Sequence, residues 1–275
     1  MVRIFILIFL ALVFSCSGEN RRSFIPFIDG YNEDLSETKI LPDLLDEISG
    51  IFYLPDGRIA SINDELGVIY FVNFDVETDS LETIEFGKKE DYEEIVKVGE
   101  SFWIMESNGD LYQVSTSGDV NKYQSKEIKK TEFEAMYFDE PNNRLVLVTK
   151  DHKEIDRAIL AYSFDLSNNQ FSSQPIYEIT MPDLHYQVKN SSVQFKPSAA
   201  AVHPVLNKVF IIASIGKILL RCSLEGKIEK AYKINPVKFQ QPEGITFAPN
   251  GDMYISNEAA QGKATILKFP YGNLN

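Results

Sequence analysis

Hydrophobic positions along this chain come in short runs, and the runs are separated by sequences typical of turns. The runs are rich in β-branched and aromatic residues, several of them alternate with polar positions, and the turns read PDG, SNG, EPNN, LEG and PNG. Short runs of this kind between turn signals are typical of β-strands. Helical periodicity is weak and confined to residues 76–90. The pattern therefore predicts an all-β protein.

One short sequence phrase occurs five times within this pattern. It consists of a polar residue, a small residue, an apolar run, a turn and a further apolar run. The polar residues are Ser49, Glu93, Glu134, Ser198 and Glu243, at intervals of 44, 41, 64 and 45 residues. A unit of about 40–45 residues that holds several strands is typical of a β-propeller blade. We therefore expect one domain, residues 36–275, folded as a five-bladed β-propeller.

Two segments decide how the ring is completed. The interval of 64 residues leaves a sixth blade open as an alternative, but its sequence favours a longer third blade (RAILAYSFDLS, QPIYEIT) followed by an inserted loop, MPDLHYQVKNSSVQ. The last repeat ends too soon for a fourth strand, and the strand-like segment ETKIL lies before the first repeat. We expect this N-terminal strand to join the last blade and close the ring, because closure removes an exposed sheet edge.

The first sixteen residues differ from the rest of the chain. An unbroken apolar run, residues 4–14, follows one arginine and ends in VFSC, which resembles a bacterial lipobox. We expect residues 1–15 to be a signal peptide, and residues 16–35 to be a lipidated Cys16 with its tether. This predicts a membrane-anchored lipoprotein of the bacterial cell envelope, on the periplasmic or outer-surface side. A plain secretory peptide with an incidental cysteine is the alternative.

The composition and net charge of the chain restrict the classes of partner that it is expected to bind. The 275 residues are 44% hydrophobic, enough for one sizeable core, and 40 acidic against 27 basic residues give a net charge of −13. Nucleic-acid binding needs a basic face, so we expect no nucleic-acid partner. The only cysteine besides Cys16 is Cys222, in an apolar run, where a core position is expected. The three histidines have no metal spacing, and the turn at His203 predicts a surface imidazole.

The polar residue that begins each phrase suggests a cation-binding site. In a propeller the innermost strands line a central channel, so the five residues that begin the phrase converge on one mouth. Crowded carboxylates must take up protons or share a cation, and calcium accepts many oxygen ligands in flexible geometry. The absence of His and Cys from these positions argues against zinc. Alternatively, each glutamate only accepts backbone N–H bonds in its own turn.

A second polar set follows the second strand of each repeat. It comprises Asn63, Asp64, Glu106, Lys150, Ser214, Asn257 and Glu258. We expect part of this set, together with the two serines of the recurring phrase, to be accessory residues of the mouth: Ser49, Ser198, Asp64, Glu106 and Glu258. The alternative is that these are turn-forming polar residues.

The repeat phrases resemble the SdiA-regulated (YjiK-like) family of bacterial propellers, which are distantly similar to NHL-repeat proteins. The matching phrases are SG at 49–50, DYEEI at 91–95, FEAM at 133–136, PSAA at 197–200 and PEGI at 242–245. The resemblance implies an exported, membrane-associated five-bladed propeller with a calcium site, whose carboxylate ligands here are Glu93, Glu134 and Glu243. Ala135, Ala199 and Ala200 depart from the family pattern. No reaction is implied.

Three functions remain open. The first is a binding module that recognises an unknown protein or small-molecule ligand through the calcium-occupied mouth. The second is a calcium-dependent hydrolase, resembling lactonases or esterases, in which Asp64, Glu106 or Glu258 would act as the base. The third is a purely structural ring of carboxylates. No catalytic residue is assigned from the sequence.

Overall fold

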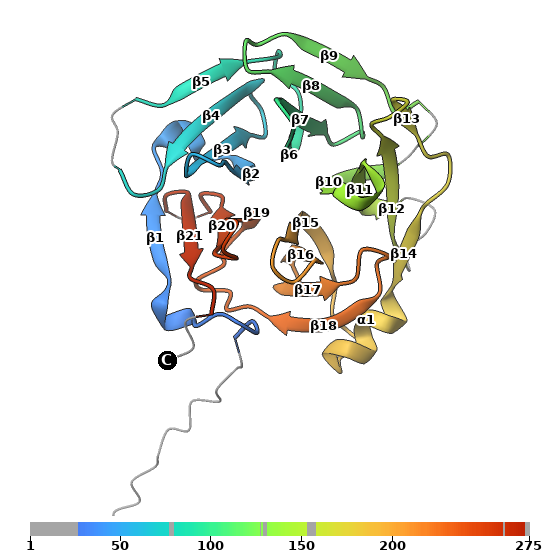
Figure 1. Cartoon of the computed structure of the whole chain (residues 1–275). Coiled ribbons are helices and arrows are strands. Elements are labelled where there is room, and N and C mark those ends of the chain that lie inside the picture. The colour runs from blue at the N-terminus through green and yellow to red at the C-terminus, as the bar shows by residue number, and fades with distance from the viewer. Residues whose placement is uncertain are drawn as a thin grey trace, which may run out of the picture.

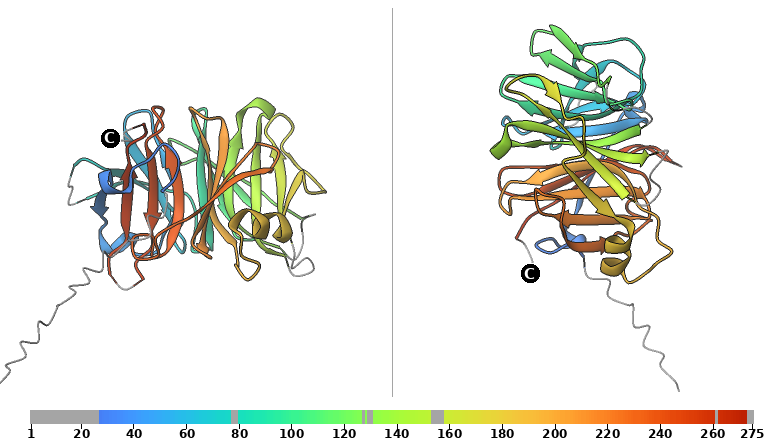
Figure 2. Two further views of the ribbon diagram at one scale, coloured as in Figure 1. Left: turned by 90° about the horizontal axis from the view of Figure 1, so that it is seen from below. Right: turned by 90° about the vertical axis from the view of Figure 1, so that its right-hand side faces the viewer.

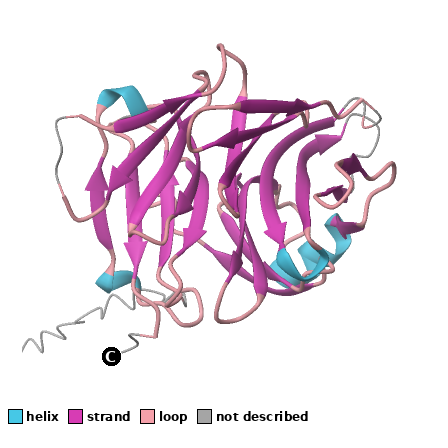
Figure 3. Cartoon of the chain, turned by 45° about the horizontal axis from the view of Figure 1, so that its top comes forward, coloured by secondary structure: helices cyan, strands magenta, loops and turns pink. Residues whose placement is uncertain are grey.

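The computed structural model describes residues 27–272 except 77–79, 127, 129–130, 153–157 and 261. The predicted signal peptide and Cys16 lie outside the described residues. Strands dominate the described part of the chain (Figure 3). Within that part, no helix is long and apolar enough to cross a membrane.

The described residues form five antiparallel sheets arranged as blades around a central channel, which confirms the predicted five-bladed propeller (Figure 1). Blade one contains β2 (Ile48–Tyr53), β3 (Arg58–Asn63), β4 (Val68–Asn73) and β5 (Glu82–Glu85). Blade two contains β6 (Tyr92–Val98), β7 (Ser101–Glu106), β8 (Leu111–Ser115) and β9 (Val120–Tyr123). Blade three contains β10 (Thr131–Asp139), β11 (Arg144–His152), β12 (Ala158–Asp165), β13 (Gln170–Phe171) and β14 (Tyr177–Thr180). Blade four contains β15 (Lys196–His203), β16 (Lys208–Ile215), β17 (Ile218–Cys222) and β18 (Ile228–Lys233).

Blade five closes the ring as predicted. It contains β19 (Pro242–Phe247), β20 (Met253–Asn257), β21 (Thr265–Phe269) and, as its outer strand, β1 (Glu37–Ile40). The segment ETKIL therefore supplies the strand that the C-terminal repeat lacks, with Thr38 opposite Leu267. A further bridge joins Tyr31 to Tyr271, so both ends of the described chain are held on one blade.

The described residues of the long third interval form no sixth blade. Strand β12 pairs with both β13 and β14, which makes blade three five-stranded. The expected loop after it contains helix α1 (Met181–Val188), because Thr180 caps the helix by accepting the N–H of Asp183 and Leu184 is fully buried. Helix α1 lies on the outside of the ring, beside β18 (Figure 2). Three short 3₁₀ helices, Glu33–Leu35, Asp43–Leu45 and Glu140–Asn142, complete the described elements.

Five hydrophobic clusters hold the blades together, one at each interface between neighbouring blades. Between blades one and two, for example, Ile62 and Phe71 pack with Ile104. Cys222 is buried, as expected of a core residue, and Trp103 is buried too. Burial of this apolar area, rather than contacts across the channel, is the main force that assembles the ring.

His203 is buried, so the predicted surface position is wrong. Its ring packs against Phe247 and Tyr271, at centroid distances of 4.7 and 4.8 Å. The turn satisfies one ring nitrogen internally, since Nδ1 accepts the N–H groups of Val205 and Leu206 at 3.1 and 3.2 Å. Burial lowers the pKa of His203 to about 4, and the imidazole is therefore neutral near pH 7.

Replacing Ile104 by alanine tests the interface between blades one and two. We expect the free energy of unfolding to fall by about 2–5 kcal/mol, because the substitution leaves a cavity in a fully buried site. The matched control is Ile40→Ala on β1, where the side chain is 62% exposed and the change should stay within about 0.5 kcal/mol. Urea unfolding measures both, and equal losses would contradict the packing described here.

Candidate functional site at the acidic channel mouth

A β-bulge explains why the first residue of the recurring phrase is polar. In all five blades the pairing between the innermost strand and its neighbour shifts register at this residue. In blade two, for example, Tyr92 lies opposite Glu106 and Glu94 lies opposite Met105, so that Glu93 has no partner. A bulged residue leaves the ladder and re-aims its side chain. The repeated bulge thus releases one polar side chain per blade at the same end of the channel.

These bulges and the adjoining loops line a cavity of about 460 Å³ at the channel mouth. Its lining residues are Glu47, Ile48, Ser49, Asp64, Asp91, Glu93, Ser107, Glu132, Glu134, Lys150, Gln241, Glu243 and Glu258. The structure therefore brings together the three predicted ligand glutamates with Ser49, Asp64 and Glu258. Among the residues that the structure describes, eight carboxylates and one lysine line the cavity.

Two predicted accessory residues lie elsewhere. The carboxylate of Glu106 accepts hydrogen bonds from Tyr112 and Lys122 at 2.8 and 2.9 Å. Its partners therefore lie within blade two, and it is not among the lining residues of the mouth. Ser198 donates its hydroxyl to the carbonyl of Pro242 at 2.6 Å. It joins two neighbouring inner strands and is absent from the mouth lining.

Ser49 makes the equivalent link between blades one and two, with its Oγ donating to the carbonyl of Tyr92 at 2.9 Å. In both cases the serine satisfies the carbonyl just before a bulged glutamate, Glu93 or Glu243. The serines of the repeat therefore support the bulges of the next blade, although Ser49 also lines the mouth.

Burial and mutual repulsion disfavour ionisation of the inner glutamates. Burial and the neighbouring Glu134 raise the pKa of Glu93 to about 9, and the same two causes raise the pKa of Glu243 to about 8. The Ser214 hydroxyl bonds to Glu243 and opposes part of this rise. Protons are therefore retained at this mouth at neutral pH.

Lys150 is the basic side chain among the described lining residues of the mouth, and the sequence assigned it no role. It occupies the second strand of blade three, where a register shift also releases it from the ladder. Its ammonium bonds to the Glu134 carboxylate. Burial alone would lower the pKa of Lys150, but the carboxylates of Glu134, Glu93 and Glu243 raise it.

In the other half of the mouth, no basic side chain of the described lining offers such compensation. Burial and a hydrogen bond with Glu47 raise the pKa of Glu258 to about 7. Burial, with the charges of Glu47 and other acidic neighbours, raises the pKa of Asp64 to about 6. Oδ1 of Asp64 is buried without a hydrogen-bond partner among the described residues. Negative charge therefore accumulates on the side of the mouth away from Lys150.

The donor chemistry of the mouth suits a hard cation. The described lining residues offer carboxylate and hydroxyl oxygens and no imidazole or thiolate, which matches calcium or magnesium better than zinc. Among the residues that the structure describes, no three acidic, histidine or cysteine side chains form a ready-made metal centre. The pairing of Glu134 with Lys150 is one reason, since it removes that carboxylate from the predicted trio.

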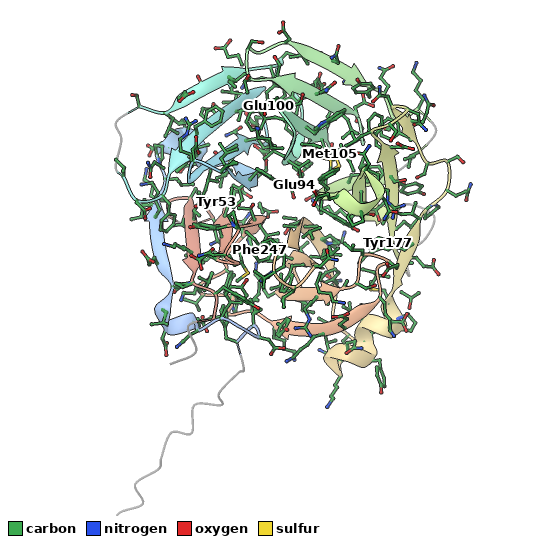
Figure 4. The ribbon with its side chains drawn as sticks, in the orientation of Figure 1. Tyr53, Glu94, Glu100, Met105, Tyr177 and Phe247 are labelled. Carbon is green, nitrogen blue, oxygen red and sulfur yellow. The ribbon has the colours of Figure 1, made fainter. Side chains whose placement is uncertain are left out.

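Glu94 is the residue that sequence reasoning missed. It is 1% exposed, and its carboxyl accepts N–H groups from Ile95 and Ala200 at 3.1 and 3.4 Å, with Met136 as a third donor. It stands where the other repeats have Gly50, Ala135, Ala199 and Gly244. An aligned set of the five phrases contains this signal, because only one of them has a large side chain at the small position. Figure 4 shows Glu94 at the centre of the ring.

No family model and no curated protein matches the chain. Solved structures do match its fold. Myxococcus xanthus glutaminyl cyclase is 9% identical with a TM-score of 0.55, and the match covers 85% of this chain and 95% of that one. Regucalcin from Agrobacterium tumefaciens, described as a calcium-binding protein, is 8% identical with a TM-score of 0.53 and coverages of 81% and 90%. An inactive virginiamycin B lyase from Staphylococcus aureus is 12% identical with a TM-score of 0.50 and coverages of 87% and 90%. At these identities the chain is similar to them in fold alone.

Proposed function

We propose that this protein is a propeller-type binding module that takes up a hard divalent cation, calcium, at the acidic channel mouth. The observation that carries the proposal is the charge of the mouth, where eight carboxylates and one lysine of the described part of the chain line about 460 Å³. Two like charges about 4 Å apart repel by about 4 kcal/mol at an effective dielectric constant of about 20. Protons relieve this repulsion in part, and a divalent cation would relieve more of it.

The carboxylates that no lysine holds are the best ligands. Asp64 and Glu258 lie on the uncompensated side, and Oδ1 of Asp64 is buried without a partner among the described residues. Glu93 and Glu243 supply further oxygens from the bulges. Glu134 remains the partner of Lys150 and is the weakest of the three ligands expected from the sequence. Calcium takes roughly six to eight oxygens, so water and Ser49 would complete the shell.

The wider role follows from the N-terminal sequence and the family resemblance. Lipid on Cys16 and the polar tether would hold the propeller at the bacterial cell envelope. The loaded mouth would then bind a protein or small-molecule partner, since propellers place their binding groups at one face of a rigid ring. The resemblance to the SdiA-regulated family and the likeness to a calcium-binding regucalcin agree with this role.

Glu258 favours hydrolysis as a second candidate function. A general base works best when its pKa lies near the working pH, and the pKa of Glu258 is raised to about 7. Bound calcium would polarise a substrate carbonyl. In this second function Asp64, Glu93 and Glu243 would hold the calcium. Glu258 would instead take the proton from an attacking water, with Gln241 holding one of its carboxylate oxygens through a bond of 2.9 Å. Lactones and simple esters are the substrates to screen.

Calcium titration followed by thermal unfolding tests the cation site. At a calcium concentration of about 100 times Kd, binding should add about 2.7 kcal/mol and raise Tm by roughly 5–10 °C. The double variant Glu243→Gln/Glu258→Gln should lose this rise. The control Glu85→Gln, on the exposed outer strand β5, should keep it. An unchanged Tm in the wild-type protein, or an equal rise in all three proteins, would refute the proposal.

The pH dependence of stability gives an independent check. Glu258, Glu243 and Glu93 have pKa values raised to about 7, 8 and 9 in the folded protein, whereas unfolded glutamate titrates near 4.3. The folded protein thus holds protons that the unfolded chain has released, and stability falls as the pH rises from about 6.5 to 9.

Without divalent cations we expect a loss of about 2 kcal/mol or more over this range, since one unit of pKa difference is worth about 1.4 kcal/mol. His203, with its pKa near 4 against about 6.5 when unfolded, contributes only below this window. Urea unfolding at several pH values measures the slope. Glu93→Gln/Glu243→Gln should flatten it, and a wild-type slope of zero would mean that the carboxylates interact less than described.

A further inference from the structure

A second cavity lies at the opposite end of the channel from the acidic mouth. Its volume is about 460 Å³, within the range of about 300–1,000 Å³ that is typical of small-ligand sites. All five inner strands contribute to it near their C-terminal ends, together with the turns that follow them. Glu94 lines this cavity and is absent from the lining of the acidic mouth. It therefore forms the boundary between the two.

The walls of this cavity are apolar and partly aromatic. Deep positions are occupied by aliphatic side chains such as Ile51 and Ile245, and the outer wall includes Phe52, Tyr53, Phe138 and Phe247. Tyr53, Phe247 and Glu94, labelled in Figure 4, all line this cavity. The site is also well supported, because Tyr53 N–H donates to Thr246 Oγ1 at 3.0 Å across the interface between two blades. A rigid apolar wall of this kind suits a compact hydrophobic molecule.

The carboxyl of Glu94 gives the cavity a specific polar group. A carboxylate offers about four acceptor positions, and three backbone N–H groups use three of them. Lys97 is the only basic residue of the described lining, and its ammonium donates to the Gly99 carbonyl at 2.7 Å, away from Glu94. Glu94 thus keeps one acceptor position and has no cationic partner in the described lining. Buried carboxyl groups are usually fully bonded and paired.

We propose that this cavity binds a small apolar amine, whose ammonium group donates a hydrogen bond to Glu94 while its hydrophobic body packs on the aromatic wall. Aromatic faces attract cations as well as apolar groups, so Phe52 and Phe247 suit both parts of such a ligand. Burial raises the pKa of Glu94 well above its usual range, and an ammonium group bound beside it would favour the charged form of the carboxyl. Glu140 adds a second acidic side chain to the lining. An anionic ligand would meet both carboxyl groups, while Lys97, the basic residue of the described lining, is already bonded to a backbone carbonyl.

The experiment must separate this cavity from the acidic mouth, which also attracts cations. Isothermal titration of the full chain with 4-phenylbutylamine, and with 4-phenylbutanol as its neutral counterpart, measures the contribution of the amine. We expect one amine site and at least tenfold weaker binding of the alcohol. Glu94→Gln should reduce the affinity for the amine at least tenfold and bring it close to that for the alcohol.

Two further variants decide which cavity binds the amine. Ala201→Phe adds bulk to the cavity wall without altering Glu94, and it should abolish amine binding even if Glu94→Gln proves unstable. Glu243→Gln/Glu258→Gln, at the acidic mouth, should leave amine binding unchanged. The proposal is overturned if neither probe binds, if both bind equally, or if amine binding survives Ala201→Phe and is lost in the mouth variant. None of these outcomes depends on calcium, so the calcium proposal stands or fails separately.

Discussion

The β-bulge at the start of each innermost strand is the constraint on which the functional parts of this propeller depend. A regular ladder would pair every residue of the inner strand and direct its side chains toward the neighbouring blades. The register shift at the recurring polar residue instead releases one side chain per blade at the same end of the channel. Ser49 and Ser198 stabilise this geometry by binding the carbonyl that precedes a bulged glutamate in the next blade.

The consequence is a concentration of charge that the fold must balance. Glu93, Glu134 and Glu243 come from three separate blades, and their burial makes each of them harder to ionise. The fold balances one of them with Lys150, which a register shift on the second strand releases toward the same mouth. The remaining carboxylates keep protons near neutral pH. At the cation site proposed above, proton release and cation uptake would therefore be linked.

The fold was predictable from the sequence because its information is local and repeated. The spacing of the phrases gave the blade number, and the missing strand of the last repeat identified ETKIL as the closing strand. The mouth glutamates were predictable for the same reason, since a recurring position in a repeat occupies an equivalent place in each blade. Helix α1 was not expected, because its capping residue Thr180 belongs to the preceding strand and its apolar stripe is short.

The sequence did not reveal the roles of residues whose surroundings differ from blade to blade. Glu106 is the last residue of β7 and Glu258 comes directly after β20, yet Tyr112 and Lys122 on the outer strands of its own blade bind Glu106. Those neighbours are specific to blade two, so a pattern shared by five blades cannot predict them. In the sequence, Lys150 is one of several polar residues near the end of a second strand. Its role depends on charges that two other blades contribute, which no local pattern contains.

Glu94 shows how one departure divides the channel into two different environments. The inner strands approach so closely that a Cβ on Gly50 would lie 2.5 Å from Oε1 of Glu94, and one on Gly244 would lie 2.7 Å from the Ser49 carbonyl. Small residues in the other four blades therefore leave space for one long side chain, and blade two fills it. The carboxyl then binds N–H groups of other inner strands, which ties the blades together at the axis. Because this one side chain separates an acidic mouth from an apolar cavity, the two ends of the channel present chemically different surfaces within a single ring.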